Sequence, residues 1–171
     1  MKNNKPMKIL ALDPSGTSTT GIFLFENWTN WKIISYTDKN YLNQAKNIQE
    51  LAKKEQVNLI VCEVSSLWEK SRHNYHFLDL IKLTGIIEWI SQELGIEFVP
   101  ISNQYMNRWK AEAKERKIAG LSFKQIQGKT GRPKGVWYFK DRELNDHEKD
   151  ALLIFWIYWV KFKKREWPFT N

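Results

Sequence analysis

The chain has 171 residues, of which 42% are hydrophobic and 27% charged, so it fits one globular domain and excludes a disordered chain. Its net charge of +8 is concentrated between Asn103 and Arg142, where eleven basic and three acidic residues lie, and this basic segment predicts a surface that contacts phosphate. A single cysteine, Cys62, excludes an internal disulfide and favours a reducing, cytoplasmic setting. The longest apolar run, Ala151 to Val160, is too short to cross a bilayer, so we expect no membrane association.

The first third of the chain has the pattern of a sheet. Apolar runs predict four strands, at Met7–Asp13, Gly21–Glu26, Trp31–Tyr36 and Val57–Glu63. Polar turns separate the first three, and helical spacing predicts one helix over residues 40–55, before the fourth. The first and last of these runs are continuously apolar, which is typical of central parallel strands covered on both faces.

The rest of the chain alternates helices with one further strand. We expect a long helix over His73–Leu94, ended by Gly95, a short strand at Ile96–Pro100, a basic helix over Asn103–Lys117 and a last helix over His147–Phe162. Residues 121–140 lack a clear helical or strand period and are predicted to be irregular or short helices. The order of elements predicts one α/β domain over residues 1–171, with a mixed sheet flanked by helices.

Three segments each place an acid where a metal-dependent enzyme would need one. The first and fourth predicted strands end on Asp13 and Glu63, and the last helix opens with His147 and Asp150, which share one face. A carboxylate at the tip of a buried strand costs desolvation energy unless it is paired or binds a cation, so the three acids together predict a shared metal site. The acids also have structural interpretations. Asp13 can cap the following turn, Glu63 can lie where its strand becomes exposed to solvent, and the acids of the last helix can complement its dipole.

These motifs resemble those of the RuvC-type Holliday junction resolvases, within the RNase H-like nuclease superfamily. Asp13-Pro14 and Thr20-Gly21 match the family's first strand and loop, Glu63 matches its second acid, and His147-Glu-Lys-Asp150-Ala-Leu matches its closing motif. The resemblance spans about residues 7–160, although the loop before Thr20 is one residue longer than usual and residues 111–145 depart from the family. It implies an RNase H-like mixed five-stranded sheet, three antiparallel strands followed by two parallel ones, flanked by helices.

The resemblance also implies an activity. It is that of a metal-dependent endonuclease that hydrolyses phosphodiester bonds in branched DNA, most specifically in Holliday junctions, with two Mg²⁺ or Mn²⁺ ions per site. Asp13, Glu63 and Asp150 would be metal ligands, and His147 a ligand or a proton carrier. Asp146 lies one residue off the closing motif and is a substitute candidate. Symmetric cutting of a four-way junction needs two active sites, so we expect a homodimer that uses the long helix or the last helix as its face.

DNA contacts are expected from two parts of the chain. After Glu63, Trp68 could stack on an unpaired base or belong to the core, and Lys70 and Arg72 would hold phosphates. In the basic segment the expected phosphate contacts are Arg108, Lys110, Lys129, Arg132 and Lys134. Residues 121–140 can be interpreted either as a helix-turn-helix-like insertion or as a plain basic loop.

Three other functions compete with junction cleavage. An RNase H-like nuclease could act on flaps or RNA, and a non-catalytic DNA-binding module could use the helix-turn-helix interpretation of residues 121–140. An actin-like nucleotide-binding fold is less favoured, because Asp13-Pro-Ser-Gly16-Thr17 has one residue more than the phosphate loop of that fold. The chain is also too short for the two domains that such a fold uses to enclose a nucleotide.

Overall fold

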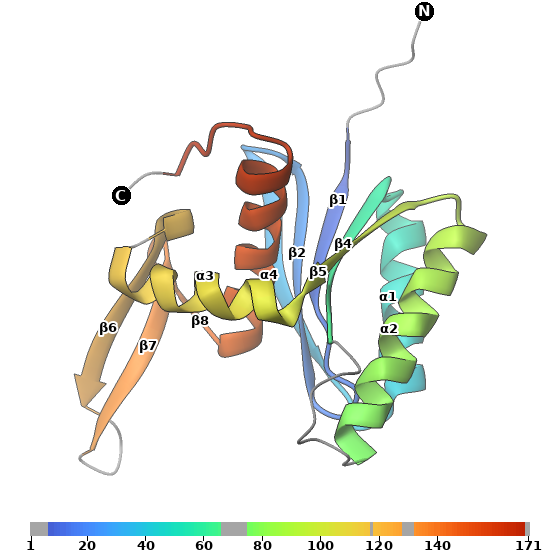
Figure 1. Ribbon diagram of the computed structural model, residues 1–171, viewed down its shortest axis with the longest axis horizontal. Helices are drawn as coiled ribbons and strands as arrows, with labels where there is room; N and C mark the ends of the chain where they lie inside the picture. Colours follow the sequence, from blue (N-terminus) through green and yellow to red (C-terminus); the bar gives the residue numbers. More distant parts are fainter. Residues whose placement is uncertain (1–6, 66–74, 117, 128–131, 170–171) are drawn as a thin grey trace, which may run out of the picture.

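A mixed five-stranded sheet forms the centre of the molecule in the computed structural model, which describes residues 7–65, 75–116, 118–127 and 132–169 (Figure 1). Its strand order is β3-β2-β1-β4-β5. Strands β1, β2 and β3 are antiparallel neighbours, whereas β4 runs parallel to β1, and β5 parallel to β4. The strands are β1 (Ile9–Asp13), β2 (Thr19–Asn27), β3 (Asn30–Thr37), β4 (Leu59–Val64) and β5 (Glu97–Ser102). The predicted sheet, three antiparallel strands followed by two parallel ones, is confirmed.

Helices cover both faces of this sheet (Figure 1). One face carries α1 (Tyr41–Glu55) and α2 (Tyr75–Glu93). The opposite face carries α3 (Asn103–Arg116), α4 (Asp146–Trp156) and the π-helical continuation of α4 (Ile157–Phe162). The side chains of β1 alternate between the two faces, as the pleat of a strand requires: Leu10 and Leu12 pack toward α1 and α2, and Ile9 and Ala11 toward α4.

The predicted helix boundaries agree with the structure to within two residues. Gly95 follows α2 with a φ of +64°, the left-handed conformation that ends many helices, as predicted. The last helix was expected as one α-helix to Phe162, but its final turns, Ile157–Phe162, are π-helical.

Within residues 121–140, the described residues 121–127 and 133–139 are strands, so neither a helix-turn-helix nor a plain loop describes them. After a short 3₁₀ turn (Ile118–Gly120), β6 (Leu121–Gln127), β7 (Pro133–Phe139) and β8 (Arg142–Leu144) form a second, antiparallel sheet in the order β6-β7-β8. The signal was present: a run of β-branched and aromatic residues in β7, preceded by a glycine-containing segment, is typical of a hairpin. This signal is ambiguous, because the glycines and lysines of that segment also suit a loop or a turn that contacts phosphate.

The core on the α4 side is built largely of aromatic rings. Phe155 is fully buried, and its ring centroid lies 4.9 Å from that of Phe23 and 4.7 Å from that of Phe25. Trp156, Tyr158 and Trp159 are also buried, which confirms that the aromatic excess of the last helix belongs to the core. Within the described ranges, no helix has both the length and the apolar content needed to cross a membrane.

We predict that Phe155→Ala lowers the free energy of unfolding by about 3–5 kcal/mol, because it opens a cavity among rings that cannot collapse into it. Phe162→Ala is the matched control, since this phenylalanine ends the same helical stretch but is 46% exposed. Its expected cost is under about 1 kcal/mol. Urea unfolding followed by tryptophan fluorescence measures both changes. Equal losses for the two variants would contradict the assignment of Phe155 to the core.

Candidate active site

The register of the sheet brings Asp13 and Glu63 to the same edge. Leu12 of β1 pairs with Cys62 of β4 in parallel, so the next residues of the two strands are Asp13 and Glu63. Both continue the alternation of Ala11 and Val61, whose side chains pack on the α4 side of the sheet. The two carboxylates therefore project toward α3 and α4 from neighbouring strands, as the sequence predicted.

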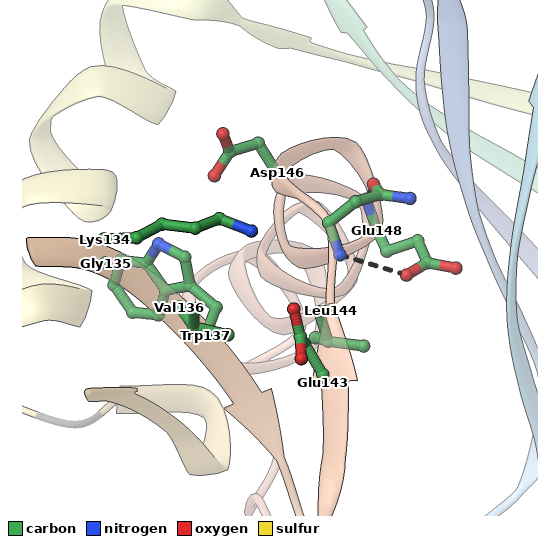
Figure 2. Close-up of a pocket in the computed structure, with 9 residues that line it drawn as sticks. Lys134, Gly135, Val136, Trp137, Glu143, Leu144, Asp146 and Glu148 are labelled. Carbon is green, nitrogen blue, oxygen red and sulfur yellow. Dashed lines mark hydrogen bonds between the residues drawn. The ribbon is translucent and has the colours of Figure 1, made fainter. Parts of the chain in front are cut away.

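The start of α4 is fixed by a capping box and an arginine. The side chain of Asn145 accepts a hydrogen bond from the backbone N–H of Glu148 at 2.9 Å, and the Glu148 carboxylate accepts one from the backbone N–H of Asn145 at 3.2 Å (Figure 2). Arg142 donates to the same carboxylate at 2.7 Å and to the carbonyl oxygen of Ile33 at 2.6 Å. These bonds attach the first turn of α4 to the central sheet and orient His147 and Asp150.

Gly21 explains the Thr-Gly part of the first motif. A Cβ placed on Gly21 would lie 1.9 Å from the carbonyl oxygen of His147, so only glycine lets α4 lie this close to β2. The preceding Thr20 is fully buried, and its hydroxyl accepts a hydrogen bond from the backbone N–H of Ser15 at 3.0 Å, which closes the loop after Asp13. The motif therefore sets the distance between β2 and the last helix and closes the loop that follows Asp13.

The four predicted site residues converge with two lysines. Nδ1 of His147 lies 2.7 Å from Oδ2 of Asp13. The ammonium of Lys110, from α3, lies 3.0 Å from Oδ2 of Asp150 and 3.4 Å from Oε2 of Glu63, so it joins the acids of α4 and β4. Lys149 adds a second ammonium, 3.1 Å from Oδ1 of Asp150. We refer to Asp13, Glu63 and Asp150 as the carboxylate cluster.

Burial dominates the electrostatics of this cluster. It raises the pKa of Glu63 to about 7, since the attraction of Lys110 is outweighed by burial and by the charges of Asp13 and Asp150. Burial likewise raises the pKa of Asp150, against the opposing charges of Lys149 and Lys110. The hydrogen bond to Asp13 raises the pKa of His147 above its usual value, although burial works against it. Asp13 appears among the causes of all three shifts, which places its charge inside the cluster.

The chemistry of the cluster fits a hard divalent cation. Its donors are mainly carboxylate oxygens, the ligands that Mg²⁺ and Mn²⁺ prefer, with one imidazole beside them. Oδ1 of Asp150 is buried and accepts no hydrogen bond, because Lys149 lies close to it but is not aligned to donate. As these side chains stand, no three acidic, histidine or cysteine side chains of the described ranges are arranged around one ion. The ammonium of Lys110 lies between Glu63 and Asp150 instead.

Two lysines of the cluster were not identified as such from the sequence. Lys110 was assigned to the DNA surface, and the structure places it between Glu63 and Asp150. Lys149 received no role, and its position next to Asp150 in the chain was its only signal. Asp146, the substitute candidate, has a side chain that is 81% exposed. It lines a hollow of about 450 Å³ together with residues of β7 and β8, including Lys134 and Trp137 (Figure 2).

The predicted DNA contacts are distributed over two elements. Arg108 is exposed on α3, where its guanidinium lies 3.5 Å from Glu112, and Arg132 and Lys134 are exposed at the start of β7. Trp68, Lys70, Arg72 and Lys129 lie outside the described residues.

Two solved structures of RuvC from Thermus thermophilus resemble this chain over nearly their whole length. The one described as RuvC in complex with a Holliday junction substrate matches with a TM-score of 0.62 and 12% sequence identity, and the other with a TM-score of 0.58 and 14% identity. Each match covers 92% of this chain and 96% of the other. No protein-family model matches the sequence, and no curated protein is significantly similar to it. The predicted RNase H-like fold is thereby confirmed.

The raised pKa of Glu63 predicts a pH-dependent stability in EDTA. Between its ordinary pKa near 4.5 and about 7, the folded protein holds a proton that the unfolded chain has lost, so the unfolding free energy falls as pH rises through this window. We expect Glu63→Gln to remove a fall on the order of 1–3 kcal/mol between pH 5 and pH 8.

Urea unfolding at these two pH values measures the effect, with Glu50→Gln, an exposed carboxyl on α1, as the control. A pH dependence in Glu63→Gln equal to that of the unsubstituted protein would show that this carboxyl is not destabilised by burial.

Proposed function

We propose that this protein is a metal-dependent endonuclease that hydrolyses phosphodiester bonds in branched DNA, with the four-way Holliday junction as its substrate. The observation that carries the proposal is the meeting of Asp13, Glu63 and Asp150 from three distant segments at one edge of an RNase H-like sheet. The two RuvC structures with this fold, one of them bound to a Holliday junction, support the choice of substrate class.

Each residue of the site has a distinct role in the proposed reaction. The carboxylate cluster would hold the cations, two Mg²⁺ or Mn²⁺ ions per site, which when bound supply activation of water and stabilisation of the leaving 3′ oxygen. Asp13 orients the imidazole of His147 through its contact with Nδ1. The hydrogen bond to Asp13 raises the pKa of His147, and its ring is 38% exposed, so we assign it the transfer of a proton at the scissile phosphate.

The surroundings of the cluster suit a DNA strand. A hollow of about 400 Å³ lies beside His147 and is lined by residues of the loop after β1 and of the start of α2, among them Pro14, Gly16, Thr17 and His76. Arg108, Arg132 and Lys134 supply exposed positive charge on the α3 and β7 side. Trp68, Lys70, Arg72 and Lys129 are proposed as further contacts on the strength of the sequence.

A homodimer would present two such sites to the two strands that must be cut. Most aromatic residues of the last helix are buried within the chain itself, namely Phe155, Trp156, Tyr158 and Trp159. Their burial disfavours this helix as the dimer face. On α2, Leu78 and Trp89 are 47% and 55% exposed, and this helix is the proposed face.

We predict that Asp150→Asn abolishes cleavage of a labelled four-way junction in Mg²⁺, with a rate loss on the order of 10³-fold or more. The substitution removes a charged ligand but keeps its shape, so binding of the junction in EDTA should persist. Asp146→Asn, on the same helix but 81% exposed, is the matched control and should cut normally. Retained cutting by Asp150→Asn would refute the assigned site. Parallel reactions with a flap, an RNA–DNA hybrid and plain duplex identify the preferred substrate.

We also predict that binding of the junction in EDTA weakens steeply with salt, because the positive charge of the basic segment displaces counterions from phosphates. A loss of affinity of about 10³-fold between 50 and 200 mM KCl is expected for a surface with at least six phosphate contacts. Fluorescence anisotropy with a labelled junction measures it. An affinity that does not change with salt would contradict the phosphate role of the basic segment.

A further inference from the structure

The outer half of the β6–β7 hairpin is exposed on both faces. Residues 124–127 of β6 and 132–135, which lead into and begin β7, are all exposed, and we refer to these eight residues as the ribbon. Successive side chains of a strand point to opposite faces, so consecutive exposed residues mean that neither face of the ribbon packs on the body of the protein. At a rise of about 3.3 Å per residue, the four residues of β6 extend about 13 Å.

The inner half of the hairpin anchors the ribbon firmly. Leu121, Val136, Trp137 and Phe139 are buried there, and the rings of Phe123 and Trp137 lie 5.1 Å apart. An isolated two-stranded hairpin is only marginally stable in water, so this packing is what keeps the ribbon formed. The exposed half gains no stability from burial. A binding partner would account for its extended shape and its charge.

The charge of the ribbon is entirely positive. It contains Lys124, Arg132 and Lys134 and no acidic residue. Acidic side chains lie nearby at the hollow beside β7 and β8, where Glu143 and Asp146 share the lining with Lys134 (Figure 2). This polarity favours a polyanion along the ribbon and disfavours one in the hollow.

The edges of the ribbon are open but protected against pairing with another strand. Strand β8 pairs with Trp137, Tyr138 and Phe139 and stops short of the ribbon. Pro133 has no N–H to donate and lies between Arg132 and Lys134, and β6 carries Lys124. Proline and basic side chains are features by which proteins discourage edge-to-edge association. A second copy of this chain is therefore the less favoured partner.

We propose that the ribbon enters the major groove of a duplex arm and directs Lys124, Arg132 and Lys134 to the phosphates beside it. The major groove of B-DNA, about 12 Å wide, admits a two-stranded β-ribbon. This inference rests on the proposed function and extends it, because it assigns a duplex arm to one element. The base of the ribbon also reaches the site: the Lys149 ammonium, 3.1 Å from Asp150, lies 5.1 Å from the ring centroid of Trp137. The arm held by the ribbon thus lies next to the carboxylate cluster.

The test compares two triple variants with equal loss of charge. The ribbon variant carries Lys124→Gln, Arg132→Gln and Lys134→Gln, and the control carries Lys46→Gln, Lys53→Gln and Lys54→Gln, all exposed on α1 at the opposite face of the sheet. Binding to a long-armed four-way junction is measured in EDTA over a range of salt concentrations. The slope of log Kd against log salt should decrease by about 2–3 in the ribbon variant and by less than about 1 in the control.

A chemical probe distinguishes groove entry from contact with phosphate alone. Dimethyl sulfate methylates guanine N7 in the major groove, so the unsubstituted protein and the control should protect guanines in one arm, and the ribbon variant should not. Absence of this protection with the unsubstituted protein, or equal slopes in the two variants, would overturn the proposal. So would a ribbon variant that keeps the slope but changes its mass in light scattering, since the ribbon would then pair with a second copy.

The proposed function can fail independently of the ribbon. If Asp150→Asn still cuts the junction, the catalytic assignment falls while the slope and the N7 protection continue to test the ribbon. Circular dichroism of both triple variants confirms that they are folded before binding is compared.

Discussion

Burial of negative charge at the ends of β1 and β4 is the constraint around which this molecule is arranged. Asp13, Glu63 and Asp150 are each largely removed from water, and a buried carboxylate is costly unless a cation or hydrogen bonds compensate it. Here Lys110, Lys149 and His147 supply that compensation from α3 and α4. The compensation is incomplete, since the pKa values of Glu63 and Asp150 remain raised. A cation bound here, as proposed above, would stabilise the ionised form of these carboxylates.

The last helix connects the core to this edge. Its aromatic residues fill the space between the central sheet and the second sheet, while its first turn is tied down by the capping box and by Arg142. Gly21 allows the helix to lie directly against β2. Packing of the apolar end of α4 therefore fixes the positions of His147 and Asp150 at its polar end. A site built on a rigid, packed helix holds its side chains in accurate positions.

In the second sheet, the residue composition predicts strands, whereas the lysine content suggests a DNA-binding loop or helix pair. Val136-Trp137-Tyr138-Phe139 has the composition of a strand, and the glycine-containing stretch before it that of a turn, yet the lysines there also suit a basic loop or a DNA-binding helix pair. Charge identifies a partner but not a backbone conformation, because lysine is common on exposed helices, strands and loops alike. The pairing of Leu121 with Phe139 and of Gln127 with Pro133 is a cross-strand relation that local spacing could not resolve.

Apolar runs in the sequence located the strands of the central sheet and the acids that end two of them, because a continuous apolar run that ends on a carboxylate is typical of a buried strand. The arrangement of those strands was implied by the family resemblance. Helix periodicity placed α1, α2, α3 and the start of α4 to within two residues. Three features came from the tertiary structure: Lys110 and Lys149 lie among the acids, Asp146 lines a separate hollow, and β6 and β7 of the basic segment pair as a β-hairpin. These features arise where elements distant in sequence come into contact. The free energy of such a tertiary contact depends on burial and on distances between charges, which no local sequence pattern encodes.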